Sequence, residues 1–405
     1  MNSIQLSLDS NIDLLHQKIA EFTKPDELKQ AGLYPYFRII ESEQNTEVII
    51  NGKKVLMFGS NSYLGLTNHH AIKRASIKAI RKYGTGCSGS RFLNGTLDIH
   101  LELEEKLARF VGMDDALVFS TGFQVNLGVI PALLSRHGYL ILDELDHASI
   151  IEGARLSLAK IFKYQHNNME SLEKVLQNCQ PDKIKLIVID GIFSMAGDIA
   201  NLPEINNLAK KYGASIMVDD AHSIGVIGEG GRGTSSYFNL TDDTHLIMGT
   251  FSKSLASTGG FIASDQMTIN YLKHQARTLI FSASLSAAAT AGVLATLEII
   301  ENEPERIDQL WANTHFTLTE LNLLGFDTGT SCTPIIPIYI RDDLNTFKLS
   351  NMLLDEGIFV NPITSPAVSK EGTLIRLSLM ATHTREQIEK MLDKLYSVSK
   401  KLSII

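Results

Sequence analysis

Between residues 116 and 250 the chain alternates short apolar runs with segments of helical periodicity. The helical segments include Met169–Gln177 and Pro203–Tyr212, and the apolar runs are Ala116–Ser120, Tyr139–Asp143, Ile184–Asp190, Ser215–Asp219 and Leu246–Thr250. Runs that are apolar on both faces favour a mostly parallel sheet covered by helices, an α/β architecture. Ligands of such sheets bind beyond the carboxyl ends of the strands. We therefore expect functional side chains just after these runs.

The pattern changes after Ser286, which indicates a second, smaller unit. The predicted elements there are a long helix to about Glu303, then Glu305–Leu324, strands near Ile335–Ile340 and Leu374–Leu379, and a closing helix over Arg385–Ser399. Upstream, the spacing of apolar residues over 97–110 predicts an amphipathic helix. We predict an N-terminal arm of residues 1–60, a large domain of residues 61–290 and a small C-terminal α+β domain of residues 291–405.

Charge and cysteine content narrow the class of protein. The 45 acidic and 37 basic residues give a net charge of −8, so no general attraction to nucleic acid is expected. Three cysteines without a C-x-x-C pair indicate a reducing compartment, with neither a disulfide framework nor a zinc site. Met1–Ala20 lacks the pattern of a signal peptide, and Ser284–Ile300 suits a buried helix better than a membrane span. We expect a cytoplasmic protein.

The stretch G-T-G-C-S-G at 84–89 matches the G-x-G-x-x-G pattern of dinucleotide-binding loops. That motif requires a preceding strand and a following helix. Residues 71–83 instead have the pattern of a helix leading into the glycines. A nicotinamide-dependent oxidoreductase is therefore a minor alternative, and a loop beside the substrate is the simpler interpretation.

The segment M-V-D-D-A-H-S at 217–223 places two acids and a histidine directly after a predicted strand. Asp219, Asp220 and His222 could ligate a metal, pair with a cationic cofactor ring, or cap the next helix. A metal site would be expected to have a further ligand nearby, and the candidates are scattered. Taken alone, the segment favours capping.

Lys253 follows the next predicted strand, in F-S-K-S-L-A-S-T-G-G at 251–260. Its neighbours are small, and no acidic residue follows before Asp265. Desolvation in such surroundings lowers the pKa of an amine, which favours a Schiff-base nucleophile. A surface lysine is the alternative interpretation for this residue alone.

Together these signals fit one cofactor, pyridoxal 5'-phosphate. It needs a lysine for its aldehyde, an acid for its ring nitrogen and small donors for its phosphate. Lys253 and Asp219 meet the first two needs, and Thr250, Ser252 and the backbone of residues 120–124, at a predicted helix start, meet the third. His147, after the strand at 139–143, could lie over the ring, although a histidine at a helix start more often only caps it. A non-catalytic binding protein would leave Lys253 unmodified.

Several motifs in order resemble the α-oxoamine synthases, which are pyridoxal-phosphate enzymes of the aspartate-aminotransferase-like fold, fold type I. They are N-S-Y-L-G-L (61–66), S-T-G-F-Q-V-N (120–126), D-H-A-S-I-I-E-G (146–153), V-D-D-A-H-S-I-G-V-I-G (218–228), G-R-G (231–233) and T-F-S-K-S (250–254). The resemblance extends from residue 34 to about residue 397. It implies the fold, the cofactor and a homodimer whose sites are built from two subunits.

The resemblance also implies residue roles. Lys253 would bond to the cofactor aldehyde, Asp219 would pair with the ring nitrogen, and His222, with Ser194 close by, would contact the phenolic oxygen. His147 would stack on the ring and meet the substrate carboxylate, which Arg376 would hold. The remaining implied contacts are with the phosphate for Gly122, Phe123, Thr250 and Ser252, with the substrate for Asn61, and across the dimer for Ser282 and Ser284.

Four further stretches resemble the family members that condense L-serine with a long-chain acyl-CoA such as palmitoyl-CoA, the first step of sphingolipid synthesis. They are Y-P-Y-F-R (34–38), residues 84–100, F-V-N-P (359–362) and S-L-M-A-T-H-T (378–384). The alternatives within the family are 2-amino-3-ketobutyrate CoA ligase and 8-amino-7-oxononanoate synthase. The long acyl substrate or product also implies peripheral contact with a membrane.

Overall fold

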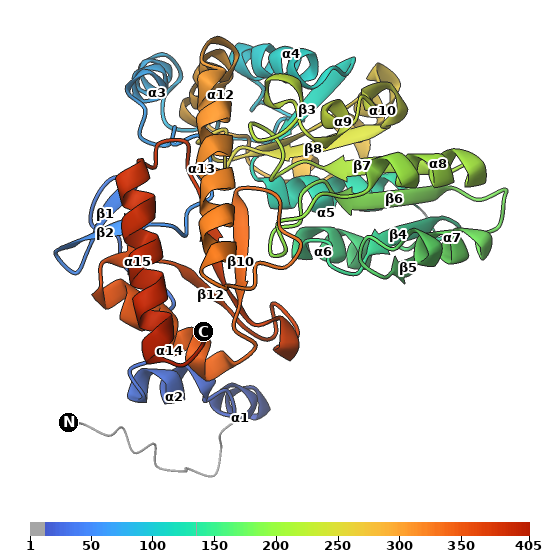
Figure 1. The fold of residues 1–405 in the computed structure, drawn as a ribbon. Coiled ribbons are helices and arrows are strands. Elements are labelled where there is room, and N and C mark those ends of the chain that lie inside the picture. The colour runs from blue at the N-terminus through green and yellow to red at the C-terminus, as the bar shows by residue number, and fades with distance from the viewer. Residues whose placement is uncertain (1–12, 135) are drawn as a thin grey trace.

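A computed structural model describes residues 13–134 and 136–405, and its largest element is a seven-stranded sheet (Figure 1). The strand order is β3-β9-β8-β7-β6-β4-β5, and β9 is antiparallel to both of its neighbours while the other pairs are parallel. The strands are β3 (Asp115–Phe119), β4 (Tyr139–Asp143), β5 (Lys160–Tyr164), β6 (Lys185–Asp190), β7 (Ser215–Asp219), β8 (Leu246–Thr250) and β9 (Gly260–Ser264). The expected mostly parallel α/β sheet is confirmed.

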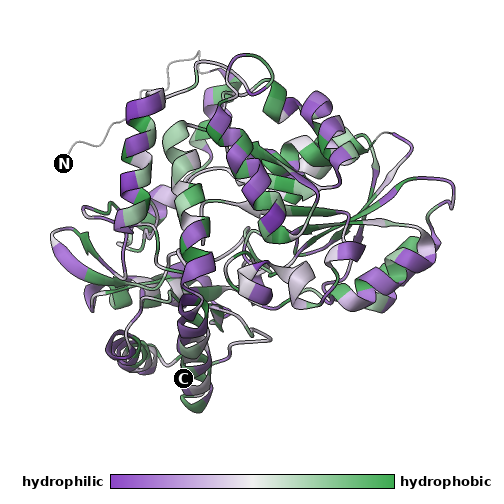
Figure 2. Cartoon of the chain, turned by 90° about the horizontal axis from the view of Figure 1, so that it is seen from above, coloured by the Kyte–Doolittle hydropathy of each residue, from purple (hydrophilic) through white to green (hydrophobic). Residues whose placement is uncertain are grey.

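Both faces of this sheet are buried, as its strand sequences require. On β6, Leu186 and Val188 belong to one hydrophobic cluster, while Ile187 and Ile189 belong to another on the opposite face. In Figure 2 the strands are largely green, and the surrounding helices mix purple and green segments. The first face is covered by α5 (Gly122–Leu133), α6 (Ala148–Leu156), α10 (Gln266–Gln275) and α11 (Arg277–Ile280). The second face is covered by α7 (Met169–Gln177) and α8 (Leu202–Tyr212). A further cluster joins β3, β8 and β9 to α3 (His70–Tyr83), α4 (Asp98–Val111) and α12 (Ala287–Asn302).

The C-terminal part forms a second, antiparallel sheet of order β10-β13-β12, with helices packed around it. Its closing helix starts with a capping box, in which Thr384 and Gln387 satisfy each other's backbone N–H groups. The elements are α13 (Glu305–Leu323), β10 (Ile335–Tyr339), α14 (Asp343–Asp355), β11 (Ile358–Phe359), β12 (Asn361–Ile363), β13 (Leu374–Ser378) and α15 (Arg385–Lys401).

The N-terminal segment joins this C-terminal part. Strands β1 (Glu47–Ile50) and β2 (Lys53–Met57) form a hairpin, and β11 adds to it in parallel. Two short helices, α1 (Leu14–Ala20) and α2 (Lys24–Gln30), begin the described chain (Figure 1), and Gly32, just after α2, accepts a hydrogen bond from Asn351 of α14 at 3.1 Å. Residues 1–12, which belong to the predicted arm and to the stretch Met1–Ala20, lie outside the described residues. The domain boundaries at residues 60 and 290 stay predictions.

Two strands of the large sheet were not predicted. The edge strand β5 carries Lys160 and Lys163, so it lacks the apolar signature of a strand buried on both faces. Only nine residues connect the end of β8 to the start of β9, and this connection lacks the helix that separates the other strands in sequence. The loop at 84–89 follows helix α3 rather than a strand, so the dinucleotide motif is not formed. Among the described helices, none combines the length and apolar character needed to cross a membrane.

Candidate active site

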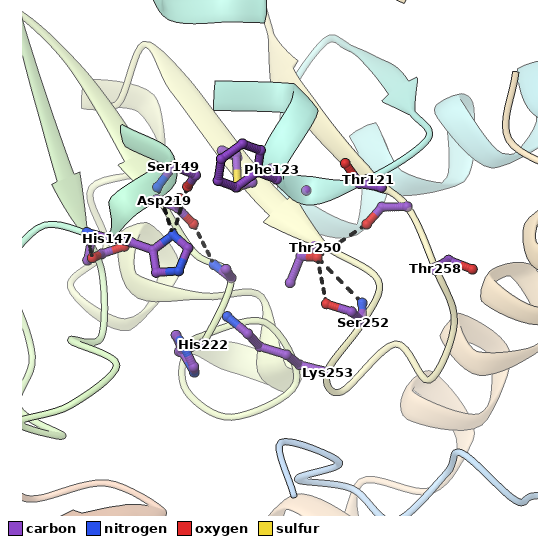
Figure 3. A pocket seen from close by; sticks show the side chains of 15 residues that line it. Thr121, Phe123, His147, Ser149, Asp219, His222, Thr250, Ser252, Lys253 and Thr258 are labelled. Atoms are coloured by element: carbon purple, nitrogen blue, oxygen red, sulfur yellow. Dashed lines mark hydrogen bonds between the residues drawn. The ribbon is translucent and has the colours of Figure 1, made fainter. Parts of the chain in front are cut away.

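A cavity of about 310 Å³ lies where strands β6, β7 and β8 end and helices α5 and α6 begin. This is the edge of the sheet at which the sequence predicts a site. Figure 3 shows its lining side chains converging from these separate elements. The lining residues are Thr121, Gly122, Phe123, His147, Ser149, Asp190, Asp219, Ala221, His222, Met248, Thr250, Ser252, Lys253, Thr258 and Gly259.

One end of the cavity is an anion site at the start of α5. Thr121 caps this helix, with its Oγ1 accepting from the Gln124 amide at 3.1 Å. A Cβ atom at Gly122 would lie 2.6 Å from Thr250 Oγ1, so only glycine allows this close approach. Thr250 and Ser252 add hydroxyl groups 3.0 Å apart. Free N–H groups at a helix start, together with hydroxyl donors, suit a phosphate.

A buried carboxylate lies at the end of β7. Asp219 accepts a hydrogen bond from the Ala221 amide at 3.0 Å and another from Asn126 Nδ2 at 2.8 Å. Its neighbour Asp220 instead accepts the N–H of Thr234, the first residue of α9 (Thr234–Tyr237). Helix capping, the interpretation favoured for the segment alone, therefore describes Asp220, whereas Asp219 faces the cavity.

Lys253 extends from the loop after β8 toward His222 and His147 (Figure 3). Burial lowers the pKa of its amine to about 8, while the carboxylates of Asp219 and Asp190 act in the opposite direction. A pKa near 8 leaves a substantial neutral fraction at physiological pH, and the neutral amine is the nucleophile. The chemical environment predicted for Lys253 is therefore present.

The two histidines of the cavity are held differently. His147 caps α6, and its Nδ1 lies 2.8 Å from Ser149 Oγ. His222 is buried, with Nδ1 2.7 Å from the hydroxyl of Tyr63. Burial is the main cause that lowers the pKa of each imidazole, and for His222 the positive charge of Lys253 adds to it. The lowered pKa of each imidazole favours its neutral form at physiological pH.

Arg376 lies beside the cavity rather than in its lining. Its guanidinium donates to Ser194 O and Ser378 Oγ, each at 2.6 Å, and to the Tyr63 hydroxyl at 3.4 Å. Asn61 is reached through the same tyrosine, whose hydroxyl donates to Asn61 Oδ1 at 3.4 Å. Tyr63 therefore joins Asn61 and Arg376 next to His222, and Arg376 in turn holds Ser194.

Ser282 and Ser284 are not brought into the cavity of this chain. Ser282 Oγ accepts from Gln124 at 3.1 Å, and Ser284 Oγ donates to Gly89 O at 3.1 Å. The predicted site residues that do line the cavity are Gly122, Phe123, His147, Asp219, His222, Thr250, Ser252 and Lys253.

Several residues of the site escaped sequence reasoning. Thr121 and Asn126 stand inside a motif already singled out, and Asp190 ends a predicted strand, so their positions carried a usable signal. Ser149 and Tyr63 also stand inside quoted motifs, at 146–153 and 61–66, but their contacts with Asn126 and His222 join residues distant in sequence, so their roles were not predicted.

Comparison with known proteins places this chain in a family. The family model described as "Aminotransferase class I and II" matches residues 53–395. Serine palmitoyltransferases of Bacteroides ovatus and Sphingobacterium spiritivorum are 55% and 56% identical, covering 97% and 96% of this chain and 100% and 98% of their own lengths. An 8-amino-7-oxononanoate synthase of Thermosipho melanesiensis is 43% identical over 94% of this chain and 97% of its own length.

A solved structure of a serine palmitoyltransferase (SPT) with a pyridoxal 5'-phosphate (PLP) internal aldimine matches with a TM-score of 0.94 and 34% identity. The match covers 97% of this chain and all of the matched chain. With the fold and the cavity above, this chain belongs to the class I and II aminotransferase family of fold type I. Within that family it groups with the serine palmitoyltransferases, and the α-oxoamine synthase resemblance is confirmed.

The residues present fit pyridoxal phosphate. The close approach of Gly122 and Thr250 leaves a cradle of backbone N–H and hydroxyl donors at one end of the cavity. A buried carboxylate, Asp219, lies in the same cavity as an amine of lowered pKa, Lys253. A phosphate, a protonated ring nitrogen and an aldehyde each therefore find a partner of the right chemistry.

Proposed function

We propose that this chain condenses L-serine with a long-chain acyl-CoA, such as palmitoyl-CoA, and releases CoA, CO2 and 3-oxosphinganine. The observation that carries the proposal is the meeting of Lys253, Asp219 and the start of α5 in one cavity. The near full-length similarity to serine palmitoyltransferases supports the choice of substrates. The reaction is a decarboxylative Claisen-type condensation, and it makes the chain an acyltransferase of sphingolipid synthesis.

In this proposal Gly122, Phe123, Thr250 and Ser252 would hold the phosphate, and Asp219 would keep the ring nitrogen protonated. His222, with Ser194 close by, would contact the phenolic oxygen, and His147 would stack on the ring. Bound pyridoxal phosphate supplies an aldehyde for the amine and a ring that withdraws electrons from the substrate Cα. Asn61, His147 and Arg376 would hold the serine carboxylate, so that the Cα–H bond of serine faces Lys253.

Lys253 then removes the Cα proton as the general base, and its lowered pKa suits that task near neutral pH. The serine Cα attacks the thioester carbonyl, a C–C bond forms, and the C–S bond to CoA breaks. Loss of the serine carboxylate as CO2 follows acylation. Reprotonation at Cα from the Lys253 ammonium completes the product.

A second candidate remains inside the family, either an 8-amino-7-oxononanoate synthase or a 2-amino-3-ketobutyrate CoA ligase. The presence of 8-amino-7-oxononanoate synthases among the relatives favours that activity over the CoA ligase. These relatives are nevertheless less similar to this chain than the serine palmitoyltransferases are. The three activities share the residues of the cavity and differ in substrate. Substrate choice therefore decides between them.

We expect the highest rate of CoA release with L-serine and palmitoyl-CoA in a matrix of glycine, alanine, serine and threonine against acetyl-, pimeloyl- and palmitoyl-CoA. Each buried methylene of the acyl chain contributes about 0.8 kcal/mol, which favours a long chain over acetyl. A group that hydrogen-bonds the serine hydroxyl discriminates more strongly than a roomy apolar pocket does. Best activity with alanine and pimeloyl-CoA, or with glycine and acetyl-CoA, would assign the chain to one of the other two activities.

Arg376→Ala is expected to raise KM for L-serine about 10- to 100-fold, because a charge-assisted bond to the carboxylate is lost. Arg376→Lys keeps the charge but not the planar fork, so an intermediate KM is expected. Steady-state kinetics with serine as the varied substrate measure both. An unchanged KM in a folded Arg376→Ala protein would remove Arg376 from the substrate site.

We also propose a homodimer in which Ser282 and Ser284 of each chain reach the partner's site. Mixed dimers of Lys253→Ala with Ser282→Tyr chains are then expected to recover about a quarter to a half of the wild-type activity, because one of their two sites has neither change. Dimers carrying Lys253→Ala in both chains are the control and should stay inactive. Verified mixed dimers without recovered activity would show that each site belongs to one chain.

L-serine and the acyl-CoA are the proposed partners. A cytoplasmic location, peripheral membrane contact through the acyl substrate or product, and lack of nucleic-acid binding stay predictions.

A further inference from the structure

A buried asparagine connects two residues of the cavity that come from different elements. Asn126 lies on α5, and its side chain is fully buried. Its Nδ2 lies 2.8 Å from Asp219 Oδ2 and 2.8 Å from Ser149 Oγ. Ser149 in turn touches the imidazole of His147. The side chains at the end of β7 and at the start of α6 are thus joined by one hydrogen-bonded path.

The chemistry of Asp219 sets the direction of both bonds made by Asn126. A carboxylate only accepts hydrogen bonds, so the amide group that faces it must be the NH2 of Asn126. The second N–H of that group then donates to Ser149 Oγ. That oxygen lies 2.8 Å from His147 Nδ1 and could still accept from this nitrogen or donate to it, so the other donor to the nitrogen decides between the two.

A second donor reaches the same ring nitrogen. The backbone N–H of Ser149 donates to His147 Nδ1 at 3.2 Å. A nitrogen that accepts hydrogen bonds carries no proton, so the proton of the neutral imidazole lies on Nε2. Figure 3 shows that the nitrogen not bonded to Ser149 lies on the side of Lys253 and His222.

We propose that Asn126 and Ser149 are positioning residues: Asp219 fixes the orientation of the Asn126 amide, and Ser149 donates to His147 Nδ1 and holds its imidazole neutral, with an N–H donor directed into the cavity. The role of that donor rests on the proposed function, in which His147 meets the substrate carboxylate. An Nε2–H group can donate to a carboxylate, whereas the other tautomer would present a lone pair and repel it.

The charged groups around His147 agree with a neutral ring. The ammonium of Lys253 opposes its protonation, and the carboxylate of Asp219 favours it. Asp190 accepts the backbone N–H of His147 at 2.7 Å, and His222 lies across the cavity. Burial has the largest effect and lowers the pKa of His147. The donors from Ser149 act in the same direction, because they stabilise the unprotonated Nδ1.

The tautomer can be measured directly in the holoenzyme labelled with 15N in its histidine rings. The His147 signals are identified by their loss in His147→Gln. We expect the shift of an unprotonated nitrogen for Nδ1 and of a protonated nitrogen for Nε2. A proton on Nδ1 would overturn the proposal. The measurement needs no turnover, so its result is independent of which substrates the enzyme condenses.

Variants test the path itself. Ser149→Ala and Asn126→Ala are each expected to raise the midpoint of the His147 titration by up to about one pH unit, the equivalent of one hydrogen bond. The double variant should shift it no further than the larger single change, because both cut one path. Additive shifts, or no shift in Ser149→Ala, would contradict the proposal. Ser149→Ala removes only a hydroxyl, so the test stands if Asn126→Ala does not fold.

A matched control is available outside the cavity. Asn206 is also a buried asparagine, and its Nδ2 donates to Asp243 at 3.0 Å. Asn206→Ala removes the same kind of amide–carboxylate bond and should leave the His147 titration unchanged. An equal shift in this control would mean that the effect of Asn126→Ala is a general loss of stability.

Discussion

Lys253→Ala is expected to lose covalent attachment of pyridoxal phosphate and to lower kcat by about 10⁴-fold or more, because one change removes both the nucleophile and the general base. In the described part of the chain no other lysine lines the cavity. Borohydride reduction of the wild-type holoenzyme, followed by peptide mapping, should find the label on Lys253.

Lys185 provides the internal control for this experiment. It is also buried, but its ammonium donates to the carbonyl oxygens of Pro181 and Lys183, away from the cavity. It should remain unlabelled. A label on Lys185 or any other lysine, or turnover near the wild-type rate in Lys253→Ala, would contradict the assignment.

The second large effect is expected for Asp219→Asn. An amide cannot hold the ring nitrogen protonated through an ion pair, so the ring withdraws electrons less strongly. Exchange of the serine Cα proton with solvent deuterium should slow by about 10²- to 10³-fold, while the cofactor still binds. Proton NMR of L-serine incubated with the enzyme measures this exchange without the acyl-CoA.

Asp243→Asn is the matched control for Asp219→Asn. Asp243 also accepts a hydrogen bond from a buried asparagine, but it lies outside the cavity. Its replacement should leave the exchange rate unchanged. Exchange at the wild-type rate in Asp219→Asn would show that the carboxylate does not support the electron-withdrawing ring.

The parts of the fold that the sequence predicts well are those in which burial dictates composition. Strand β6 is apolar at every position before Asp190 except Lys185, because helices cover both of its faces. The position of Lys253 after β8 was predictable for a related reason. Small, uncharged neighbours surround it, which is unusual for a lysine.

The rest depends on contacts between distant parts of the chain. The edge strand β5 keeps its charged residues because solvent reaches it, so it resembles a loop in sequence. Tyr63 joins Arg376 to His222 across intervals of 313 and 159 residues. The motif at 61–66 includes Tyr63, but no local pattern gives its distant partners, and the same applies to the bond between Asn126 and Asp219.

The hairpin that joins β8 to β9 has a consequence for the timing of each turnover. Backbone bonds from Phe251 to Gly259 O and from Ser257 to Phe251 O tie its residues together at 2.9 and 2.8 Å. Both ends continue directly into central strands of the sheet. The backbone under Lys253 is therefore anchored, and the amine moves by rotation about its own side-chain bonds. In exposed side chains such rotations take picoseconds to nanoseconds, whereas the loop closures that limit many enzymes take microseconds to milliseconds. Withdrawal and return of the lysine therefore require no movement of the backbone and no loop closure.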